Sequence, residues 1–298
     1  MVGLARTSVA PADLLALTKP RITLLSVLTV GAGFALAAPA SLDAWTVALW
    51  FSFIHALIGG ALVAGGTNAL NQVLERDVDA LMLRTARRPL PAGRLSPRAA
   101  AIFGVGAGAA GVLYLTLLVN LTTGLVAAAT LLSYVLVYTP LKRRTTLATL
   151  IGAIPGALPI VGGWTAAGGT ISERPGVLFA ILFFWQLPHF LALSWIYRDD
   201  YARAGLKMLS VGDTDGRATF RQAVLTAIAL VPISLVPTLL GMSGVIYFVS
   251  ALVLSGWLVV RALLAERSGG LRQVRGLFLF TLAYLPALLI FMIADRIT

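Results

Sequence analysis

The chain contains no cysteine, only two histidines and few charged residues, which make up 12% of its 298 residues. The absence of cysteine excludes disulfides, thiolate metal sites and cysteine nucleophiles, so any metal must bind to oxygen atoms or to histidine. A soluble domain carries about 25% charged residues. The low charge therefore excludes a disordered chain and an ordinary cytosolic enzyme.

Hydrophobic residues are correspondingly abundant, at 58% of the chain, and the mean hydropathy is +0.90. A helix crosses a hydrocarbon core with about 20 residues, so the chain has room for roughly eight to ten crossings and for no large soluble domain. The apolar runs predict an all-α polytopic membrane protein, a single intramembrane domain (residues 1–298) with nine transmembrane helices around a central cavity. The runs cover residues 22–41, 46–70, 99–118, 121–141, 147–168, 177–196, 222–241, 243–261 and 276–294.

The net charge of +11 would suggest nucleic-acid binding in a soluble protein. Here the basic residues follow a membrane pattern instead. The amino-terminal segment and the loops on its side hold 21 of the 23 lysines and arginines, which leaves only Arg174 and Arg296 for the other side. The positive-inside rule predicts a cytoplasmic amino terminus and an external carboxyl terminus in the cell (inner) membrane, with no nucleic-acid partner.

Polar residues gather directly after the second apolar run. Asn71, Glu75 and Asp79 are spaced four residues apart, which on a helix places them within about 80° of one another, with Asn68 in the same sector and Asp77 pointing elsewhere. Two carboxylates and a carboxamide suit Mg²⁺, which takes one or two protein carboxylates together with water and phosphate oxygens. The alternative is a charged helix end paired with its own arginines, which is costly at membrane depth without a function.

Two basic stretches follow this helical face in the sequence. The first contains Arg84, Arg87 and Arg88, whose guanidinium groups are suited to binding diphosphate. The second begins at Lys142, shortly after Tyr138. It forms another cytoplasmic polar edge, for which a purely topogenic anchor is the alternative interpretation.

A second polar cluster lies at the far end of the sixth apolar run, where Trp185 and His189 precede Arg198, Asp199 and Asp200. If one helix continues through this segment, His189 and Asp200 nearly eclipse one another, because eleven residues complete about three turns. The pattern then predicts a layered pocket with the histidine deeper in the membrane than the acid. The alternative for His189 is a hydrogen bond to a neighbouring helix.

These motifs together resemble the intramembrane aromatic prenyltransferase superfamily, and within it the protoheme IX farnesyltransferase (heme O synthase) family, over nearly the whole chain. The segments that carry the resemblance are Lys19-Pro20-Arg21, the Asn71/Glu75/Asp79 motif, Arg84-Thr85, Arg88-Pro89-Leu90, Tyr138 to Thr145, Gly162-Gly163-Trp164, Trp185 to Gly205 and Lys207-Met208-Leu209. The resemblance implies magnesium-dependent transfer of the farnesyl group of farnesyl diphosphate to a vinyl group of protoheme IX (heme b). The product would be heme O for the biogenesis of heme-copper oxidases.

The resemblance also implies roles for individual residues. The expected metal ligands and catalytic groups are Asn71, Glu75 and Asp79, with Tyr138 facing the allylic cation; the expected diphosphate ligands are Arg84, Arg88, Lys142, Arg143 and Arg198; and Trp185 with His189 would bind the heme acceptor. The superfamily's second aspartate motif is replaced here by Tyr197 and Tyr201. Asp199 and Asp200 are therefore the nearest substitutes as metal ligands, and Asp200 is also a catalytic candidate.

The implied partners are the two substrates, the lipid bilayer and a downstream heme-modifying enzyme or oxidase assembly that receives the product. Two alternatives stay open: a prenyltransferase for a quinone precursor or another aromatic acceptor, and a membrane transporter. A transporter keeps ionisable groups near the bilayer midplane, whereas the acids here gather at one end of the helices.

Two further expectations concern a loop and a histidine. The segment from Arg198 to Arg221 holds five basic residues and three glycines but few apolar residues, which predicts a mobile cover over the diphosphate. His55 stands alone among the apolar residues of the second run. A hydrogen bond inside the bundle is favoured for it over ligation of heme iron.

Overall fold

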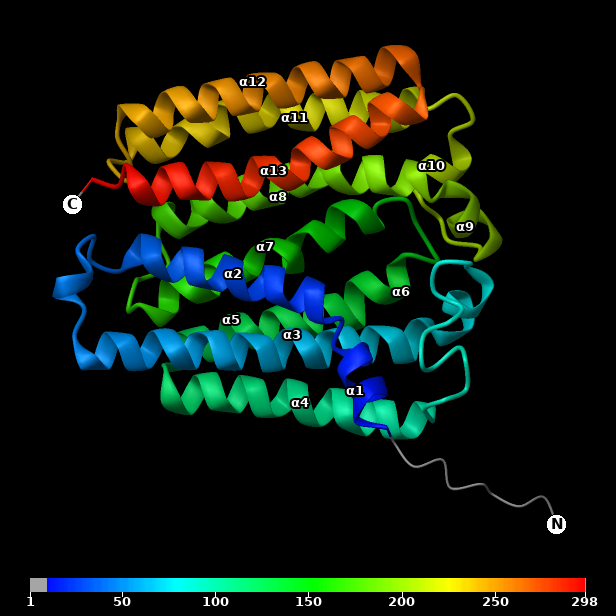
Figure 1. The fold of residues 1–298 in the computed structure, drawn as a ribbon, viewed down its shortest axis with the longest axis horizontal. Coiled ribbons are helices and arrows are strands. Elements are labelled where there is room, and N and C mark those ends of the chain that lie inside the picture. The colour runs from blue at the N-terminus through cyan, green and yellow to red at the C-terminus, as the bar shows by residue number, and fades with distance from the viewer. Residues whose placement is uncertain (1–9, 298) are drawn as a thin grey trace.

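The computed structural model describes residues 10–297, which form a bundle of helices running side by side (Figure 1). Within this range nine helical spans are long and apolar enough to cross a membrane, and no β-strand is formed. This confirms the predicted all-α fold with nine transmembrane helices. The spans are α2 (Pro20–Ala37), α3 (Val47–Leu81), α4 (Pro97–Leu118), α5 to α6 (Leu121–Leu141), α7 (Ala148–Ala166), α8 (Glu173–Ile196), α11 (Arg217–Leu239), α12 (Val245–Ser268) and α13 (Leu271–Ala294).

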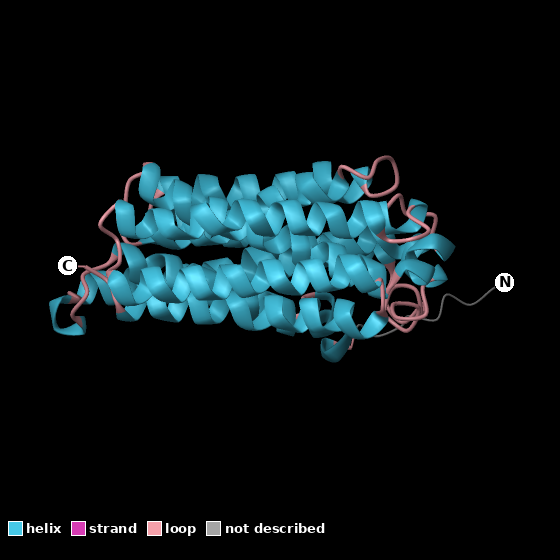
Figure 2. Cartoon of the chain, turned by 90° about the horizontal axis from the view of Figure 1, so that it is seen from above, coloured by secondary structure: helices cyan, strands magenta, loops and turns pink. Residues whose placement is uncertain are grey.

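Loops and short helices are confined to the two ends of the bundle, as Figure 2 shows. The helices α1 (Pro11–Leu17), α9 (Arg198–Arg203) and α10 (Leu209–Gly212) lie toward the same end (Figure 1), and the 3₁₀ helix η1 (Leu42–Ala44) joins α2 to α3 at the other. The basic loops expected on one side of the membrane therefore share one end of the molecule. Arg6, which contributed to that expectation, lies outside the described residues.

The surface between the two ends is apolar. Val47, Leu117 and Leu239 expose 87%, 78% and 78% of their surface, and large exposed aliphatic residues recur along most spans. In water such a surface would aggregate, whereas a bilayer solvates it. The exposed residues therefore mark the lipid-facing band of the bundle.

The helix α3 contains 35 residues, many more than a membrane crossing needs. A crossing takes about 20 residues, so about 15 residues, or about 22 Å at 1.5 Å per residue, extend past the hydrocarbon core. The polar face that begins at Asn68 occupies this extension. A rigid helix thus carries the acids to one end of the bundle.

The fourth span changes its winding beside this face. It consists of α5 (Leu121–Leu132), the π-helix η2 (Ser133–Tyr138) and α6 (Thr139–Leu141). The hydroxyl of Thr139 donates to the carbonyl of Tyr134, five residues earlier, at 2.9 Å. Single π-helical turns often occur at functional sites because they re-aim the side chains they contain, and this one contains Tyr138.

The expectation of one continuous helix from Trp185 through Asp200 is wrong. The helix α8 passes through Pro188 but ends at Ile196, where Tyr197 leaves helical geometry (φ −110°, ψ 21°), and α9 begins at Arg198. The break takes Asp200 off the axis of α8, so its carboxylate reaches backbone N–H groups of the loop after α3. His189 and Asp200 therefore do not line one helical wall.

The boundary of α11 also differs from the expected run at residues 222–241. The helix begins at Arg217, after Gly216 in the left-handed region (φ 80°), and Asp213 accepts a hydrogen bond from the backbone of Thr219 at 2.7 Å. This carboxylate satisfies a free N–H group in the first turn. Capping therefore extends the helix beyond its apolar part.

The helices α2 and α7 cross at glycines. A Cβ atom on Gly33 would overlap the backbone of Ile160, and a Cβ atom on Gly163 would overlap the backbone of Val30. Small residues allow membrane helices to approach closely. The crossing holds the end of α2 next to the end of α7, at the end of the bundle opposite the polar site.

Candidate active site

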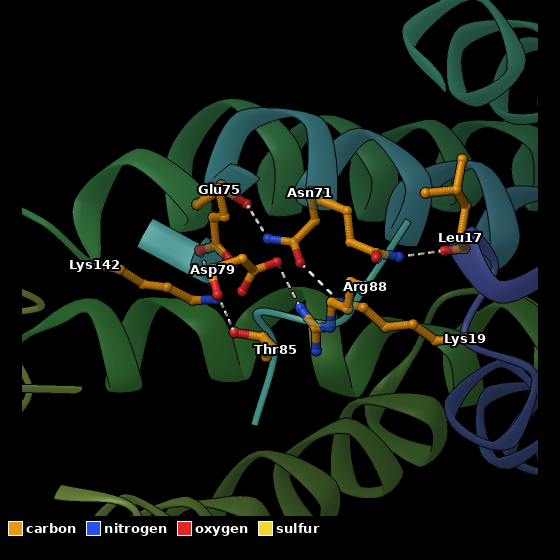
Figure 3. A network of polar contacts seen from close by, with 10 residues as sticks. Leu17, Lys19, Asn71, Glu75, Asp79, Thr85, Arg88 and Lys142 are labelled. Carbon is orange, nitrogen blue, oxygen red and sulfur yellow. Dashed lines mark hydrogen bonds and ion pairs between the residues drawn. The ribbon is translucent and has the colours of Figure 1, made fainter. Parts of the chain in front are cut away.

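The amide and the two carboxylates expected to bind metal lie buried on one face of α3. Asn71, Glu75 and Asp79 expose 1%, 7% and 1% of their surface. Figure 3 shows them together with basic side chains that come from other segments. The spacing of four residues thus places all three groups in a single polar cluster.

Each of these three groups is paired with a cation. The pairs are Lys19 Nζ with Asn71 Oδ1 at 2.9 Å, Lys142 Nζ with Glu75 Oε1 at 2.9 Å, and Arg88 Nη1 with Asp79 Oδ2 at 2.7 Å. Lys142 and Arg88 balance the two carboxylates, and Lys19 adds a further positive charge when it is protonated. Such an arrangement is suited to an anionic ligand.

Lys19 joins the cluster from the junction between α1 and α2. Its backbone lies in the left-handed region (φ 49°), which costs a residue other than glycine about 1–2 kcal/mol. Two amides of α3 hold the junction, because Gln72 donates to the carbonyl of Leu17 at 2.7 Å and Asn68 to that of Thr18 at 3.2 Å. This strained turn aims the Lys19 ammonium at Asn71.

The environment of Lys19 disfavours its charged form. Burial, followed by the nearby positive charges of Arg88 and Lys142, lowers the pKa of Lys19 to about 7. The family resemblance includes the motif Lys19-Pro20-Arg21 but implies no role for its lysine. The signal that could have indicated one is a lysine directly before the proline that opens the first membrane helix.

Lys142 connects the cluster to Tyr138. Its ammonium lies 4.5 Å from the centroid of the Tyr138 ring, a distance at which a cation interacts with the face of an aromatic ring. The ring packs where Gly152 has no side chain. Asn71 Nδ2 also donates to Thr139 Oγ1 at 3.2 Å, so the π-helical turn is tied to α3.

The loop after α3 is held from both sides. Thr85 Oγ1 donates to the carbonyl of Asp79 at 2.7 Å, and Asp200 accepts hydrogen bonds from the backbone N–H groups of Leu83 (3.3 Å) and Arg84 (3.4 Å). Burial opposes ionisation of Asp200, but its hydrogen bonds, first that from Arg203, keep the pKa of this carboxyl below its usual value. The loop that presents Arg88 is therefore fixed.

Three of the five expected diphosphate ligands, Arg84, Arg143 and Arg198, lie outside the cluster. The Arg84 guanidinium sits 4.9 Å from the centroid of the Tyr197 ring. Arg143 Nη2 donates to the carbonyl of Leu74 at 3.3 Å, on the exposed side of α3. Either side chain would have to change its rotamer to bind a ligand at the acids.

Arg198 and Asp199 lie further away, on α9. Their side chains form an ion pair at 3.7 Å, and the Asp199 side chain is 92% exposed. Both line a separate cavity of about 250 Å³ beside α10. The structure does not bring this pair to the acids of α3.

The two residues expected to bind the acceptor lie between α8 and α13. Trp185 Nε1 donates to the carbonyl of Thr281 at 2.8 Å, and His189 Nδ1 lies 2.8 Å from Thr281 Oγ1. His189 thus has the hydrogen bond to a neighbouring helix that was the alternative for it. The other histidine, His55, pairs with the hydroxyl of Tyr114 inside the bundle.

The cluster on α3 fits a hard divalent cation. Across residues 10–297, no three His, Asp or Glu side chains lie close enough to form a metal site by themselves. Mg²⁺ does not need such a cage, because it takes one or two carboxylates and completes its shell with water and phosphate oxygens. The oxygens of Asn71, Glu75 and Asp79 match that set and already share one face.

The fold and this site define a class: a polytopic membrane protein whose lipid-embedded helices carry a buried cluster of paired acids and cations at one end. The chain belongs to the UbiA prenyltransferase family, whose model matches residues 26–292. It is 46% identical over 293 residues to a protoheme IX farnesyltransferase of Solibacter usitatus (strain Ellin6076), an alignment that covers 95% of this chain and 98% of that protein.

Solved structures with low sequence identity share the fold. One, described as digeranylgeranylglyceryl phosphate synthase, has a TM-score of 0.78 at 15% identity and covers 95% of this chain and 97% of its own. A UbiA homolog from Archaeoglobus fulgidus bound to GPP and Mg²⁺ has a TM-score of 0.65 at 14% identity, with coverage of 94% and 99%. The nine-helix arrangement is therefore that of the family.

Proposed function

We propose that this chain acts as a single intramembrane domain that transfers the farnesyl group of farnesyl diphosphate to a vinyl group of protoheme IX. The observation that carries the proposal is the polar cluster of α3, Lys142 and Arg88, in a chain 46% identical to a protoheme IX farnesyltransferase. In the reaction, the bond from C1 of farnesyl to the diphosphate oxygen breaks and C1 bonds to a vinyl carbon. Water adds to the other vinyl carbon and loses a proton, which leaves a hydroxyethylfarnesyl side chain and diphosphate.

The cations of the cluster bind the diphosphate and stabilise it as negative charge grows on the leaving oxygen. Lys19, Arg88 and Lys142 point at this position already, and Arg84 and Arg143 join them by changing rotamer. When diphosphate and metal bind, the cations leave the acids for the diphosphate, and the acids bind the metal instead. In the empty site, the pairs between acids and cations keep these side chains ordered.

Asn71, Glu75 and Asp79 hold Mg²⁺ in this proposal, and a UbiA homolog has been solved with GPP and Mg²⁺. When bound, the metal supplies a Lewis-acid charge that neutralises the departing diphosphate. Tyr138 presents its ring to the allylic cation, with Lys142 above the same ring. Asp199 and Asp200 remain predicted ligands of a second metal, for which α9 would have to move.

We place the protein in the cell (inner) membrane with the cluster on the cytoplasmic side. The asymmetry of the basic residues supports this orientation. Nine crossings then leave the carboxyl terminus outside. The product carries a long apolar side chain on a macrocycle with propionates, and its handover to a heme-modifying enzyme or to oxidase assembly would occur within the bilayer.

Other activities have less support. A quinone precursor is a smaller aromatic acceptor, whereas the relative that is 46% identical to this chain is named for protoheme. A transporter is not supported, because the chain belongs to a prenyltransferase family and its acids are gathered at the end of α3.

The test is an assay of the reaction product. Membranes that contain the chain are supplied with farnesyl diphosphate, Mg²⁺ and either protoheme or a hydroxylated benzoate. The products are extracted, separated by chromatography and identified by mass spectrometry. The proposal expects farnesylated heme, and none after chelation of divalent ions. Farnesylated benzoate without farnesylated heme would show that the acceptor is an aromatic acid and not protoheme. The absence of a prenylated product from both acceptors would overturn the proposal.

A further inference from the structure

Thr281 of α13 fixes the polar edges of two aromatic side chains of α8. Its carbonyl accepts from Trp185 Nε1 at 2.8 Å, and its hydroxyl meets His189 Nδ1 at 2.8 Å. Thr281 itself is fully buried. No hydrogen bond or ion pair joins these three side chains to the acids of α3 or to the cations paired with them.

The hydroxyl of Thr281 determines which nitrogen of His189 carries the proton. Thr281 Oγ1 lies 2.6 Å from the carbonyl oxygen of Phe278, an atom that can only accept. A hydroxyl has one proton, and the carbonyl takes it, so Thr281 Oγ1 must accept from His189. Nδ1 of His189 therefore carries the proton of the neutral imidazole, and Nε2 has a free lone pair.

The plane of the imidazole is fixed as well. The Trp185 ring stacks on it with centroids 5.5 Å apart and an interplanar angle of 24°, and the Phe278 ring stacks at 4.9 Å and 30°. Nε2 makes no hydrogen bond within residues 10–297, and the side chain is only partly buried. A fixed tautomer, a fixed plane and an unused lone pair are what a metal-ligating histidine requires.

We propose that His189 Nε2 ligates the iron of the porphyrin acceptor and that Thr281 is the residue that positions it. This inference rests on the proposed function, in which the acceptor is protoheme, and names the atom that recognises it. His189 lies seven residues before the end of α8, about 10 Å below that end of the helix. The iron would thus sit at apolar depth while the diphosphate binds at the end of the bundle.

The geometry changes the role expected for Trp185. An iron bound in the imidazole plane places the macrocycle perpendicular to that plane. Because Trp185 and Phe278 are nearly parallel to the imidazole, they present ring edges to the porphyrin rather than stacking on it. Their contribution is to hold His189.

The experiment is a titration of the purified chain in lipid nanodiscs with ferric protoheme, followed by absorbance and electron paramagnetic resonance. Thr281→Val removes the hydroxyl at nearly constant volume, and Thr281→Ser retains it. His189→Gly removes the ligand, and added imidazole replaces it. His55→Ala is the matched control, because His55 is the only other histidine.

The expected result is a histidine-ligated spectrum in the wild type, in Thr281→Ser and in His55→Ala. His189→Gly loses that spectrum and imidazole restores it, while Thr281→Val binds heme about tenfold more weakly or worse, as losses of outer-shell partners do. Titration with metal-free protoporphyrin IX separates iron ligation from porphyrin binding, and the variants are expected to bind it equally.

A wild-type spectrum and affinity in His189→Gly, or in Thr281→Val, would overturn the inference. The product assay distinguishes this failure from failure of the proposed function. If the wild type forms farnesylated heme but His189→Gly leaves the heme spectrum unchanged, only the ligation of iron by His189 is refuted. The absence of farnesylated heme from the wild type would refute the activity itself.

Discussion

The structure adds Lys19 to the residues of the site. It donates to Asn71 Oδ1 at 2.9 Å from a left-handed backbone position, and burial together with Arg88 and Lys142 lowers its pKa to about 7. A diphosphate would restore the charge on this lysine by placing anionic oxygens beside it.

We expect Lys19→Met to weaken the binding of a non-hydrolysable farnesyl diphosphate analogue about tenfold, the effect of losing one charged hydrogen bond. Lys19→Arg keeps most of the affinity. The measurement is a calorimetric titration with Mg²⁺ present, and Arg272→Met, an exposed cation at the same end of the bundle, is the control. Equal affinities of wild type and Lys19→Met would show that Lys19 does not contact the diphosphate.

For single residues, the sequence predicted those positions that depend on one helix only. The shared face of Asn71, Glu75 and Asp79 follows from their spacing alone. The contact of Lys19 with Asn71 joins residues 52 positions apart and depends on a strained turn, which no periodicity reveals. The contact of His189 with Thr281 spans 92 positions and was open for the same reason.

Among the helices, α2 and α7 show how glycines allow two spans of the bundle to pack closely. Their crossing leaves no room for a side chain at Gly163. We expect Gly163→Ala to lower the free energy of unfolding by roughly 1–3 kcal/mol, the usual effect of overpacking, and to lower the unfolding temperature in detergent.

The matched control is Gly256→Ala on α12, where a Cβ atom would meet nothing within 4 Å. Alanine is a better helix former than glycine by about 1 kcal/mol, so this variant is expected to be as stable as the wild type or more so. If both substitutions had the same effect on the unfolding temperature, close packing of α2 on α7 would not be the reason for glycine at position 163.

The segment from Arg198 to Arg221 is partly helical rather than a plain loop. It docks at the site through the backbone N–H of Lys207, which donates to the carbonyl of Lys142 at 2.9 Å, and through Ser210 Oγ, which donates to the carbonyl of Ser194 at 3.1 Å. These contacts place the expected cover next to a cation of the cluster.

We expect hydrogen exchange across residues 198–221 to slow when a non-hydrolysable farnesyl diphosphate analogue and Mg²⁺ are added, because the bound anion attracts the basic residues of the segment. Residues 240–244, at the opposite end of the bundle, serve as the internal reference. Unchanged exchange in 198–221 would mean that the segment does not cover the ligand.

Hydropathy predicted the existence of every long helix but not where each one stops. The helix α8 ends at Ile196, and Asp200 beyond it accepts from the loop after α3, a contact between residues 117 positions apart. The helix α11 starts at Arg217, where Asp213 caps the backbone N–H of Thr219. Neither boundary depends on hydropathy, so an apolar run indicates only the part of a helix that lipid surrounds.

For the whole molecule, the lack of cysteine makes topology directly testable. We expect Thr170→Cys to react with a membrane-impermeant maleimide in intact spheroplasts, and Ser268→Cys to react only after the membrane is opened, since these exposed residues lie at opposite ends of the bundle. The reverse pattern would invert the orientation derived from the basic residues.

The number of crossings follows from the apolar runs, because lipid requires long apolar helices. The expected central cavity does not follow from composition in the same way. Two cavities, of about 250 and 300 Å³, lie near opposite ends of the bundle, and the position beside the α3 acids is occupied by Lys19, Arg88 and Lys142. Apolar runs cannot predict how far such side chains reach into the space between helices.

The most direct test of the account compares product formation by Glu75→Gln, Asp79→Asn and Asp77→Asn at saturating Mg²⁺. Asp77 lies on the same helix but its side chain is 72% exposed, so its variant controls for the loss of a charge. Because each buried substitution leaves a cation without its partner, the double variant Glu75→Gln/Lys142→Gln serves as a folding control, and thermal unfolding is recorded for all of them.

The account predicts that Glu75→Gln and Asp79→Asn lose farnesylated heme by about a hundredfold or more, as for the loss of a group that stabilises transition-state charge. Asp77→Asn is expected to stay within about twofold of the wild type, as for a surface substitution. Near wild-type product formation by folded Glu75→Gln or Asp79→Asn would contradict the assignment of this cluster as the metal and diphosphate site.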